Sequence, residues 1–345
     1  MKDITIFLKE LSYESGVYVS VKHLCANLEN SGITFEVVRY CDDADLLCKV
    51  MRCDSRCINL QVPSFSDETL EKILQCKDNV VVSIHSTICN LQVEEGSLER
   101  IIRWGNSDYT NLRFTCPDHK ECVGFNAVMK RQFIWLPNTF SYDCSHIDVA
   151  SSAAAKVEKD GKKDISLVCA YRPLKNMMIQ LEAVVMLSKK MPVRLHMFGE
   201  NPNSPVYRNL VALAQHNNLE LVVHPQMNNQ QCFDALQQMD LGLQVSLSET
   251  YSYVAFEHMI QGIPVVASSS VSFASEVVRY NSANDICAAM EKILDKNNYE
   301  KYCIQAQQSA AQRRQQDICN ARDAVRYMVY KTTENILVKG EGSFD

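Results

Sequence analysis

The stretch MDLGLQVSLSETYSYVAFEHMIQGIPVVAS, residues 239–268, indicates the fold of this chain. It begins with an apolar run at 241–245, which predicts a buried strand. A polar loop and a segment with helical character, 252–261, come next, and Pro264 then opens a second apolar strand at 264–268. Strand, helix and strand in this order form a βαβ unit, in which both strands lie parallel in one sheet.

The same alternation precedes this stretch through the second half of the chain. Predicted strands and helices alternate there, with strands at 165–170, 193–198 and 219–224, and helices at 176–190, 206–216 and 229–238. Beyond residue 268 only helices are predicted. Strict alternation is typical of a parallel sheet with helices on both faces, so the fold class is α/β with a doubly wound, Rossmann-like domain.

The first half of the chain predicts a second domain of the same kind. Its expected elements are strands at 4–8, 33–40, 80–84 and 133–136 and a helix at 17–30. A chain of 345 residues is too long for one ordinary hydrophobic core, and its length fits two domains. Residues 142–164 are rich in Ser, Ala and Lys without an apolar period and are predicted to be a linker, between a domain at 1–141 and a domain at 165–320.

Composition narrows the class of protein further. The formal net charge of -6 gives no sign of the basic face that nucleic-acid binding by counterion release needs. The 15 cysteines are odd in number and irregularly spaced, which argues against a disulfide framework. No signal peptide or transmembrane run is recognisable, so we expect a cytoplasmic protein with free thiols.

Three patterns could suggest a metal site, and none is expected to hold one. Cys41, Cys48, Cys53 and Cys57 lack the paired spacing of a zinc knuckle. Asp43-Ala-Asp45 has the D-x-D spacing of some metal sites but lies in what reads as an acidic loop. His119, between Cys116 and Cys122, has no fourth ligand at a fixed spacing. We therefore predict no metal and no bound cofactor.

In a doubly wound sheet, ligands bind beyond the carboxyl ends of the strands. The loop after 241–245 carries Glu249 and Thr250, and the helix that starts near Ser252 carries Glu257. The free N–H groups of that helix end could bind an anion, while the two carboxylates could bind sugar and ribose hydroxyls. The other interpretation is a capping serine followed by an acidic helix surface.

Two cations follow the strand at 165–170. Arg172 and Lys175 lie at the end of that strand, where a planar guanidinium and a point charge together suit a diphosphate. The alternative is an ordinary polar βα turn in which Pro173 sets the bend.

These residues resemble the donor site of a known family. Glu249 and Glu257 have seven residues between them, and Gly262-Ile-Pro264-Val-Val follows. This pattern is similar to the E-x7-E and Gly-x-Pro-Val-Val elements of family 4-type retaining glycosyltransferases, whose GT-B fold places two Rossmann-like domains across a central cleft. Arg172 and Lys175 match the cations that these enzymes use on the donor diphosphate. The resemblance also implies that a C-terminal helix, 321–345, packs back on the first domain.

The resemblance implies a role for each candidate residue. Arg172 and Lys175 would neutralise the leaving diphosphate, Glu249 would hold the donor sugar, and Glu257 would bind the ribose. The remaining candidates are Ser248, Thr250, Tyr251 and Ser252 of the donor loop, Gly16 after Glu14-Ser15 in the first loop, and His85, which follows a strand. His85 would contact sugar or acceptor, or it is a core histidine. A nucleotide diphosphate sugar would be a co-substrate, and the product would retain its anomeric configuration.

Departures from the family pattern keep other functions open. Thr250-Tyr251-Ser252 stands where the family commonly has Phe-Gly after the loop glutamate, and the serine removes some of the backbone freedom that glycine offers for close approach to phosphate. The run from Ile84 to Trp104 also resembles phage-encoded members of the group. The acceptor is a glycan, small molecule, protein or nucleic acid, and the last would make the chain a DNA base-modifying enzyme. A non-catalytic nucleotide-sugar-binding protein and a sugar-nucleotide epimerase are the further alternatives.

Overall fold

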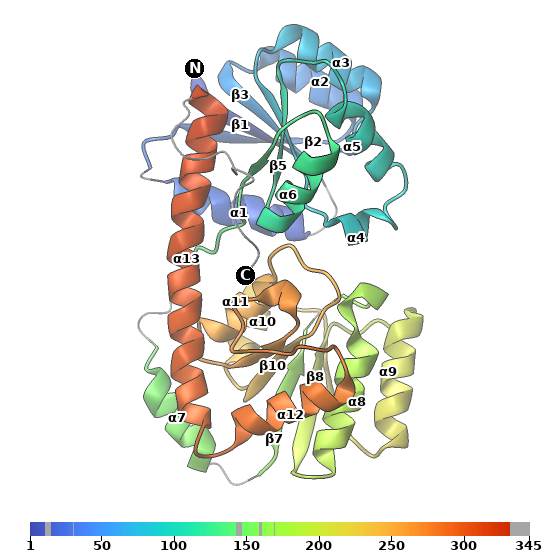
Figure 1. Cartoon of the computed structure of the whole chain (residues 1–345), viewed down its shortest axis with the longest axis vertical. Helices are drawn as coiled ribbons and strands as arrows, with labels where there is room; N and C mark the ends of the chain where they lie inside the picture. Colours follow the sequence, from blue (N-terminus) through green and yellow to red (C-terminus); the bar gives the residue numbers. More distant parts are fainter. Residues whose placement is uncertain (11–14, 30, 143–146, 159–160, 169, 332–345) are drawn as a thin grey trace. The chain divides into compact units, whose positions relative to one another are not determined.

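The structure is a computed structural model that describes residues 1–10, 15–29, 31–142, 147–158, 161–168 and 170–331. The chain divides into two compact units (Figure 1). The first unit consists of Met1–Ser141 together with the residues from Arg314 onward, and the second consists of Tyr142–Arg313. Each unit is described below by itself.

The first unit is built on a six-stranded sheet in the order β2-β1-β3-β4-β5-β6. All its neighbouring strands run parallel. The strands are β1 (Lys2–Lys9), β2 (Phe35–Tyr40), β3 (Ser55–Gln61), β4 (Val80–Ser83), β5 (Leu112–Cys116) and β6 (Phe133–Trp135). The two faces of the sheet are covered by separate apolar cores, as expected of a doubly wound sheet.

Most helices of the first unit start at a side chain that accepts a hydrogen bond from a free backbone N–H group. Ser15, Asp42 and Ser66 accept hydrogen bonds in this way at the starts of three of them. The helices are α1 (Gly16–Leu28), α2 (Asp43–Arg52), α3 (Asp67–Cys76), α4 (Ile88–Leu91), α5 (Ser97–Gly105) and α6 (His119–Val128).

The second unit has the same architecture. Its sheet is six-stranded, parallel and ordered β12-β11-β10-β7-β8-β9. The strands are β7 (Lys163–Leu167), β8 (Val193–Phe198), β9 (Glu220–His224), β10 (Leu241–Gln244), β11 (Val265–Ala267) and β12 (Glu276–Val277). The helices are α7 (Val149–Glu158), α8 (Met177–Ser188), α9 (Pro205–His216), α10 (Asn229–Leu236), α11 (Tyr253–Met259) and α12 (Ala283–Leu294), with 3-10 turns η1 (Pro173–Lys175) and η2 (Ser269–Val271).

One long helix, α13 (Tyr299–Tyr330), has residues in both units. Its first part belongs to the second unit, where the Tyr299 hydroxyl donates to the Asp240 carbonyl at 2.9 Å. Its last part belongs to the first unit, where Ala324 and Met328 are fully buried in the core that also contains α1. The change of unit falls at Arg313–Arg314.

The structure confirms the predicted doubly wound sheets and corrects three local predictions. Strand β12 lies where only helices were expected, because two residues are too few for a visible pattern. Asp43 and Asp45 lie in the first turn of α2 rather than in a loop, because Asp42 caps that helix. The range 142–164, predicted to be a linker, contains α7 and the start of β7 and lies within the second unit.

Candidate functional site

The carboxyl ends of β7 and β10 lie side by side in the second unit. Leu167 pairs with Leu243 in the parallel register of these strands, so the loops that follow them meet at the same edge of the sheet. Arg172 and Lys175 come from the loop after β7, and the residues from Ser246 to Ser252 come from the loop after β10. The structure therefore brings together the two predicted halves of the donor site.

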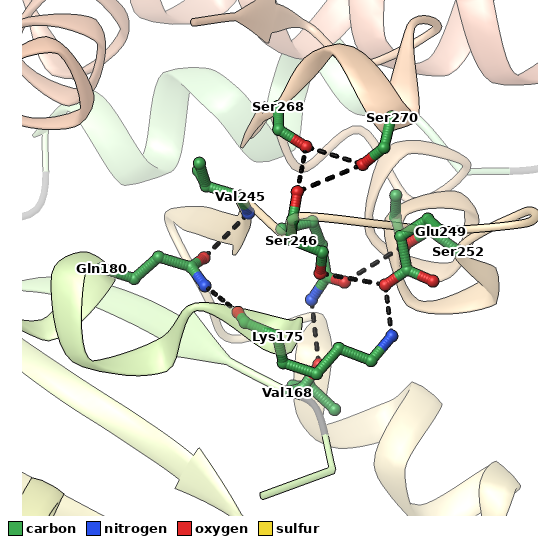
Figure 2. A network of polar contacts seen from close by, with 11 residues as sticks. Val168, Lys175, Gln180, Val245, Ser246, Glu249, Ser252, Ser268 and Ser270 are labelled. Carbon is green, nitrogen blue, oxygen red and sulfur yellow. Dashed lines mark hydrogen bonds and ion pairs between the residues drawn. The ribbon is translucent and has the colours of Figure 1, made fainter. Parts of the chain in front are cut away.

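Lys175 and Glu249 join these two loops by an ion pair. Lys175 Nζ donates to Glu249 Oε1, and the two side chains are 21% and 10% exposed (Figure 2). Ser246 Oγ donates to the same carboxylate oxygen at 3.0 Å. A largely buried pair of this kind depends on both partners, because removing one leaves an uncompensated charge.

Two residues that the sequence analysis did not single out hold these loops together. Gln180 of α8 is buried, donates through Nε2 to the Lys175 carbonyl at 2.8 Å and accepts from the Val245 amide at 2.9 Å (Figure 2). Ser268 Oγ donates to the Ser246 carbonyl at 2.5 Å. The signal available in the sequence was a glutamine among apolar residues on the buried side of α8.

Arg172 differs from Lys175 in having no partner among the described residues. Its side chain is exposed, and within the described part of the chain its guanidinium makes no hydrogen bond or ion pair. It lies immediately before η1, whose last residue is Lys175. The loop therefore presents one free cation and one cation that is already paired.

Ser252 adopts a conformation that serine rarely takes. Its φ of 58° and ψ of 73° are left-handed, in the place where the resemblance expects glycine. Its hydroxyl accepts from the Ala255 amide at 3.4 Å and donates to Gln244 Oε1 at 3.1 Å. Ser252 thus keeps the backbone geometry of a glycine, and its hydroxyl caps α11.

The other loop candidates occupy distinct positions. Ser248 is buried and Thr250 is half-buried. Tyr251 is buried and packs in an aromatic cluster, with its ring stacked on Phe256 at a centroid distance of 4.8 Å. Tyr251 therefore shapes the loop from within.

Glu257 is a buried carboxylic acid in the middle of α11. It is 8% exposed, and burial raises its pKa to about 8. The group is therefore largely protonated at neutral pH and can both donate and accept hydrogen bonds. Such a group suits a diol better than it suits a cation.

Two glycines allow close packing around α11. A Cβ atom on Gly262, which has a φ of +74°, would lie 2.4 Å from Val149 Cγ1 of α7. A Cβ atom on Gly242 would lie 2.7 Å from Cδ2 of the fully buried His258. The glycine of the Gly-Ile-Pro-Val-Val stretch is thus required both by its backbone conformation and by its neighbour.

Gly16 and His85 belong to the first unit. Gly16 is the first residue of α1 and is exposed, with open space where a Cβ atom would be. Glu14 of the same predicted loop lies outside the described residues. His85 follows β4 and is half-buried, and its Nε2 lies 2.6 Å from Gln61 Oε1.

The residues considered for metal binding have structural roles. Asp43 Oδ2 accepts from the Ser66 amide at 2.8 Å, and Asp45 pairs with Lys49 at 2.8 Å. Cys41, Cys48, Cys53, Cys57, Cys116 and Cys122 are free thiols. Among the described residues there is no group of three or more His, Cys, Asp and Glu side chains that could bind a metal ion. His119 is exposed and meets Trp135 edge-on at 5.2 Å.

Comparison with known proteins agrees with this geometry. Residues 162–296 match the family model described as glycosyl transferases group 1. No curated protein sequence matches the chain. In the part of the chain that the structure describes, no helix is both long enough and apolar enough to span a membrane.

Similar solved structures cover nearly the whole chain. Sucrose-phosphate synthase from Thermosynechococcus elongatus has a TM-score of 0.72 at 14% identity, covering 95% of this chain and 100% of that one. HepE from Anabaena, in complex with UDP-glucose, has a TM-score of 0.70 at 13% identity, with coverage of 95% and 100%. A glycosyltransferase from Rickettsia africae has a TM-score of 0.71 at 11% identity, with coverage of 95% and 99%.

The two parallel sheets and these likenesses define a protein of the GT-B fold. Within that fold, residues 162–296 are the part that matches the glycosyl transferases group 1 model, and the residues that resemble a family 4-type donor site all lie inside it.

Proposed function

We propose that this chain transfers a sugar from a nucleotide diphosphate sugar to an acceptor, with retention of anomeric configuration. One observation carries the proposal: in the part that matches the group 1 model, the free cation Arg172 and the ion pair of Lys175 with Glu249 lie at adjacent strand ends. The likeness to a HepE structure that contains UDP-glucose supports a nucleotide sugar as the donor.

The arrangement suits the chemistry of diphosphate departure. Negative charge develops on the leaving diphosphate, and cations that are already positioned stabilise it without reorganisation. Arg172 offers a planar fork for two oxygens, and Lys175 offers a point charge. Glu249 holds Lys175 until the diphosphate arrives and then becomes free to accept hydrogen bonds from sugar hydroxyls.

The protonated Glu257 completes the donor site. A neutral carboxyl can donate to one ribose hydroxyl and accept from the other, whereas a buried carboxylate could only accept. Under this proposal the donor is the only co-substrate besides the acceptor, and no metal or resident cofactor takes part. A cytoplasmic setting belongs to the same proposal, because nucleotide sugars and the free thiols of this chain both suit it.

Ligand-dependent thermal unfolding tests the donor site first. The full chain is heated with UDP, ADP, GDP, CDP and their glucose conjugates, beside Arg172→Ala and Glu257→Ala. A nucleotide present at about 100 times its dissociation constant should stabilise the protein by about 2.7 kcal/mol. Arg208→Ala is the matched control, because Arg208 is an exposed arginine of the same unit bonded only to backbone carbonyls.

The outcomes separate the alternatives. We expect the nucleotides of one base to raise the melting temperature of the native chain and of Arg208→Ala. The same nucleotides should leave the melting temperatures of Arg172→Ala and Glu257→Ala unchanged. Release of nucleoside diphosphate with an acceptor panel then reports transfer. Binding without any turnover would favour a non-catalytic nucleotide-sugar-binding protein, and the absence of any nucleotide effect would contradict the donor site.

A further inference from the structure

A row of polar side chains crosses one buried face of the first unit's sheet. Asn59 and Gln61 lie on β3, Ser83 on β4 and Thr115 on β5, and each is at most 3% exposed. Buried polar groups of this kind are costly unless every one finds a partner. The proposed sugar transfer gives no reason for them.

The hydrogen bonds of this row have a fixed direction. Asn59 Nδ2 donates to the backbone carbonyl of Val81 at 3.4 Å and to Ser83 Oγ at 2.9 Å. A carbonyl oxygen can only accept, so the amide nitrogen of Asn59 faces Val81 and its oxygen faces Gln61. Gln61 Nε2 accordingly donates to Asn59 Oδ1.

The orientation of the Gln61 amide in turn determines which nitrogen of His85 carries the proton. With its nitrogen turned to Asn59, Gln61 presents Oε1 to His85 Nε2 at 2.6 Å. Because this oxygen can only accept, the proton of the imidazole lies on Nε2. Burial lowers the pKa of His85 to about 4, so at neutral pH the ring carries a single proton and Nδ1 is bare. Within the described residues, Nδ1 makes no hydrogen bond.

His85 also lines a small cavity at the carboxyl ends of these strands. The cavity measures about 20 Å³ and is bordered by the polar side chains of Ser20, Gln61, Thr115 and Asn138. That volume admits one water-sized group such as a hydroxyl. None of the described residues around it is a lysine, arginine, aspartate or glutamate, so the cavity offers no counterion to a phosphate or an ammonium group.

We propose that Gln61 and Asn59 are positioning residues that hold His85 as the Nε2–H tautomer, which leaves Nδ1 to accept the hydrogen bond in the sugar or acceptor contact that the family resemblance implies for this histidine. The hydrogen bond from the substrate to Nδ1 rests on the proposed sugar transfer, whereas the assignment of the tautomer does not.

Long-range 1H–15N NMR of the histidine-labelled full chain tests the tautomer directly, with His85→Ala used to assign the signals. We expect the native ring to show protonated Nε2 and bare Nδ1. Gln61→Leu and Asn59→Leu should each convert it to a mixture of tautomers. Thr115→Val is the control and should leave the tautomer unchanged, because Asn59 keeps its hydrogen bonds to the Val81 carbonyl and to Ser83. A proton on Nδ1 in the native chain would overturn the proposal.

Gln61→Glu keeps the proposal testable if the leucine variants do not fold. Its carboxylate retains an acceptor for Nε2–H, so the tautomer should persist while the pKa of His85 rises. Below that raised pKa, Nδ1 gains a proton and can no longer accept. Under the proposed transfer, the rate at saturating donor should therefore acquire an acid limb that the native enzyme lacks between pH 6 and 8.

These outcomes are distinguishable from a failure of the proposed function. If no transfer is found, the NMR signals still decide whether Gln61 and Asn59 fix the tautomer. If transfer occurs but Gln61→Glu shows the native pH profile although its His85 pKa has risen, the acceptor role of Nδ1 is wrong and the donor site is unaffected.

Discussion

Lys175 Nζ donates to Glu249 Oε1 and joins the loops that follow two neighbouring strands, β7 and β10. The two residues are far apart in the sequence and come from the two halves of the predicted donor site. Their ion pair means that the two loops already hold a balanced charge beside Arg172, which has no partner among the described residues. A diphosphate would compete with Glu249 for Lys175, and this competition links diphosphate binding to release of the carboxylate.

Lys175→Met should lower the free energy of unfolding by about 3 kcal/mol, because Glu249 is left largely buried without its counter-charge. Adding Glu249→Gln to this variant should recover much of the loss, since a neutral amide needs no cation. Urea unfolding measures both. The matched control is Lys190→Ala, which breaks an exposed pair with Glu291 and should cost much less, because solvent screens that pair. Equal losses in the two lysine variants would contradict the importance of burial here.

Glu257→Gln should change the pH-dependence of stability. The folded-state pKa of Glu257 is about 8, well above its unfolded value, so the folded state binds the extra proton between about pH 5 and pH 8. The native chain therefore loses stability as pH rises through this window, and the glutamine variant does not. Relative to the native chain, the variant should gain a few kcal/mol, as an order of magnitude, between pH 5 and pH 8.

Denaturant titrations at pH 5, 6, 7 and 8 measure this difference. Glu182→Gln, on the exposed side of α8, is the control and should follow the native profile. A constant difference between Glu257→Gln and the native chain at all four pH values would show that Glu257 ionises normally in the folded state.

Ser252→Ala and Ser252→Gly should separate the cap from the backbone conformation. Alanine loses the hydroxyl that caps α11 and keeps the left-handed backbone, so it should destabilise by about 1 kcal/mol. Glycine also loses the hydroxyl but relieves the left-handed strain, which is worth about 1 kcal/mol. The glycine variant should therefore be the more stable of the two in thermal unfolding. Equal stability of the two variants would mean that the lost hydroxyl alone matters, and the reverse order would contradict strain in the left-handed backbone.

Gly242→Ala should destabilise the second unit by about 1 to 3 kcal/mol, because the added methyl group would overlap His258. The ring cannot move away easily, since its Nδ1 and Nε2 bond Val254 and Ser166 at 2.6 and 2.5 Å. Gly16→Ala provides the contrast: open space surrounds that position at the start of α1, so calorimetry should show no loss of stability. A neutral Gly242→Ala would show that the packing is looser than these distances imply.

The sequence by itself determined the class of fold and supplied the candidate residues of the donor site. Apolar runs between helical segments are local patterns, and a parallel sheet is the arrangement that buries them, so the alternation from 165 to 268 fixed the doubly wound second unit. Arg172 and Lys175 follow one strand and Glu249 and Glu257 follow another, so they were candidates because strand ends in a parallel sheet share one edge. The resemblance to the E-x7-E pattern then supplied their donor-site roles.

Only the tertiary structure decided what those residues contact. The pairing of Lys175 with Glu249, the bridge made by Gln180 and the direction of hydrogen bonds from Asn59 to His85 all join residues that no local period connects. The raised pKa of Glu257 likewise depends on neighbours that bury it. Periodicity reports which face of an element is buried, whereas a side chain's partner and charge state depend on atoms that folding brings from elsewhere in the chain.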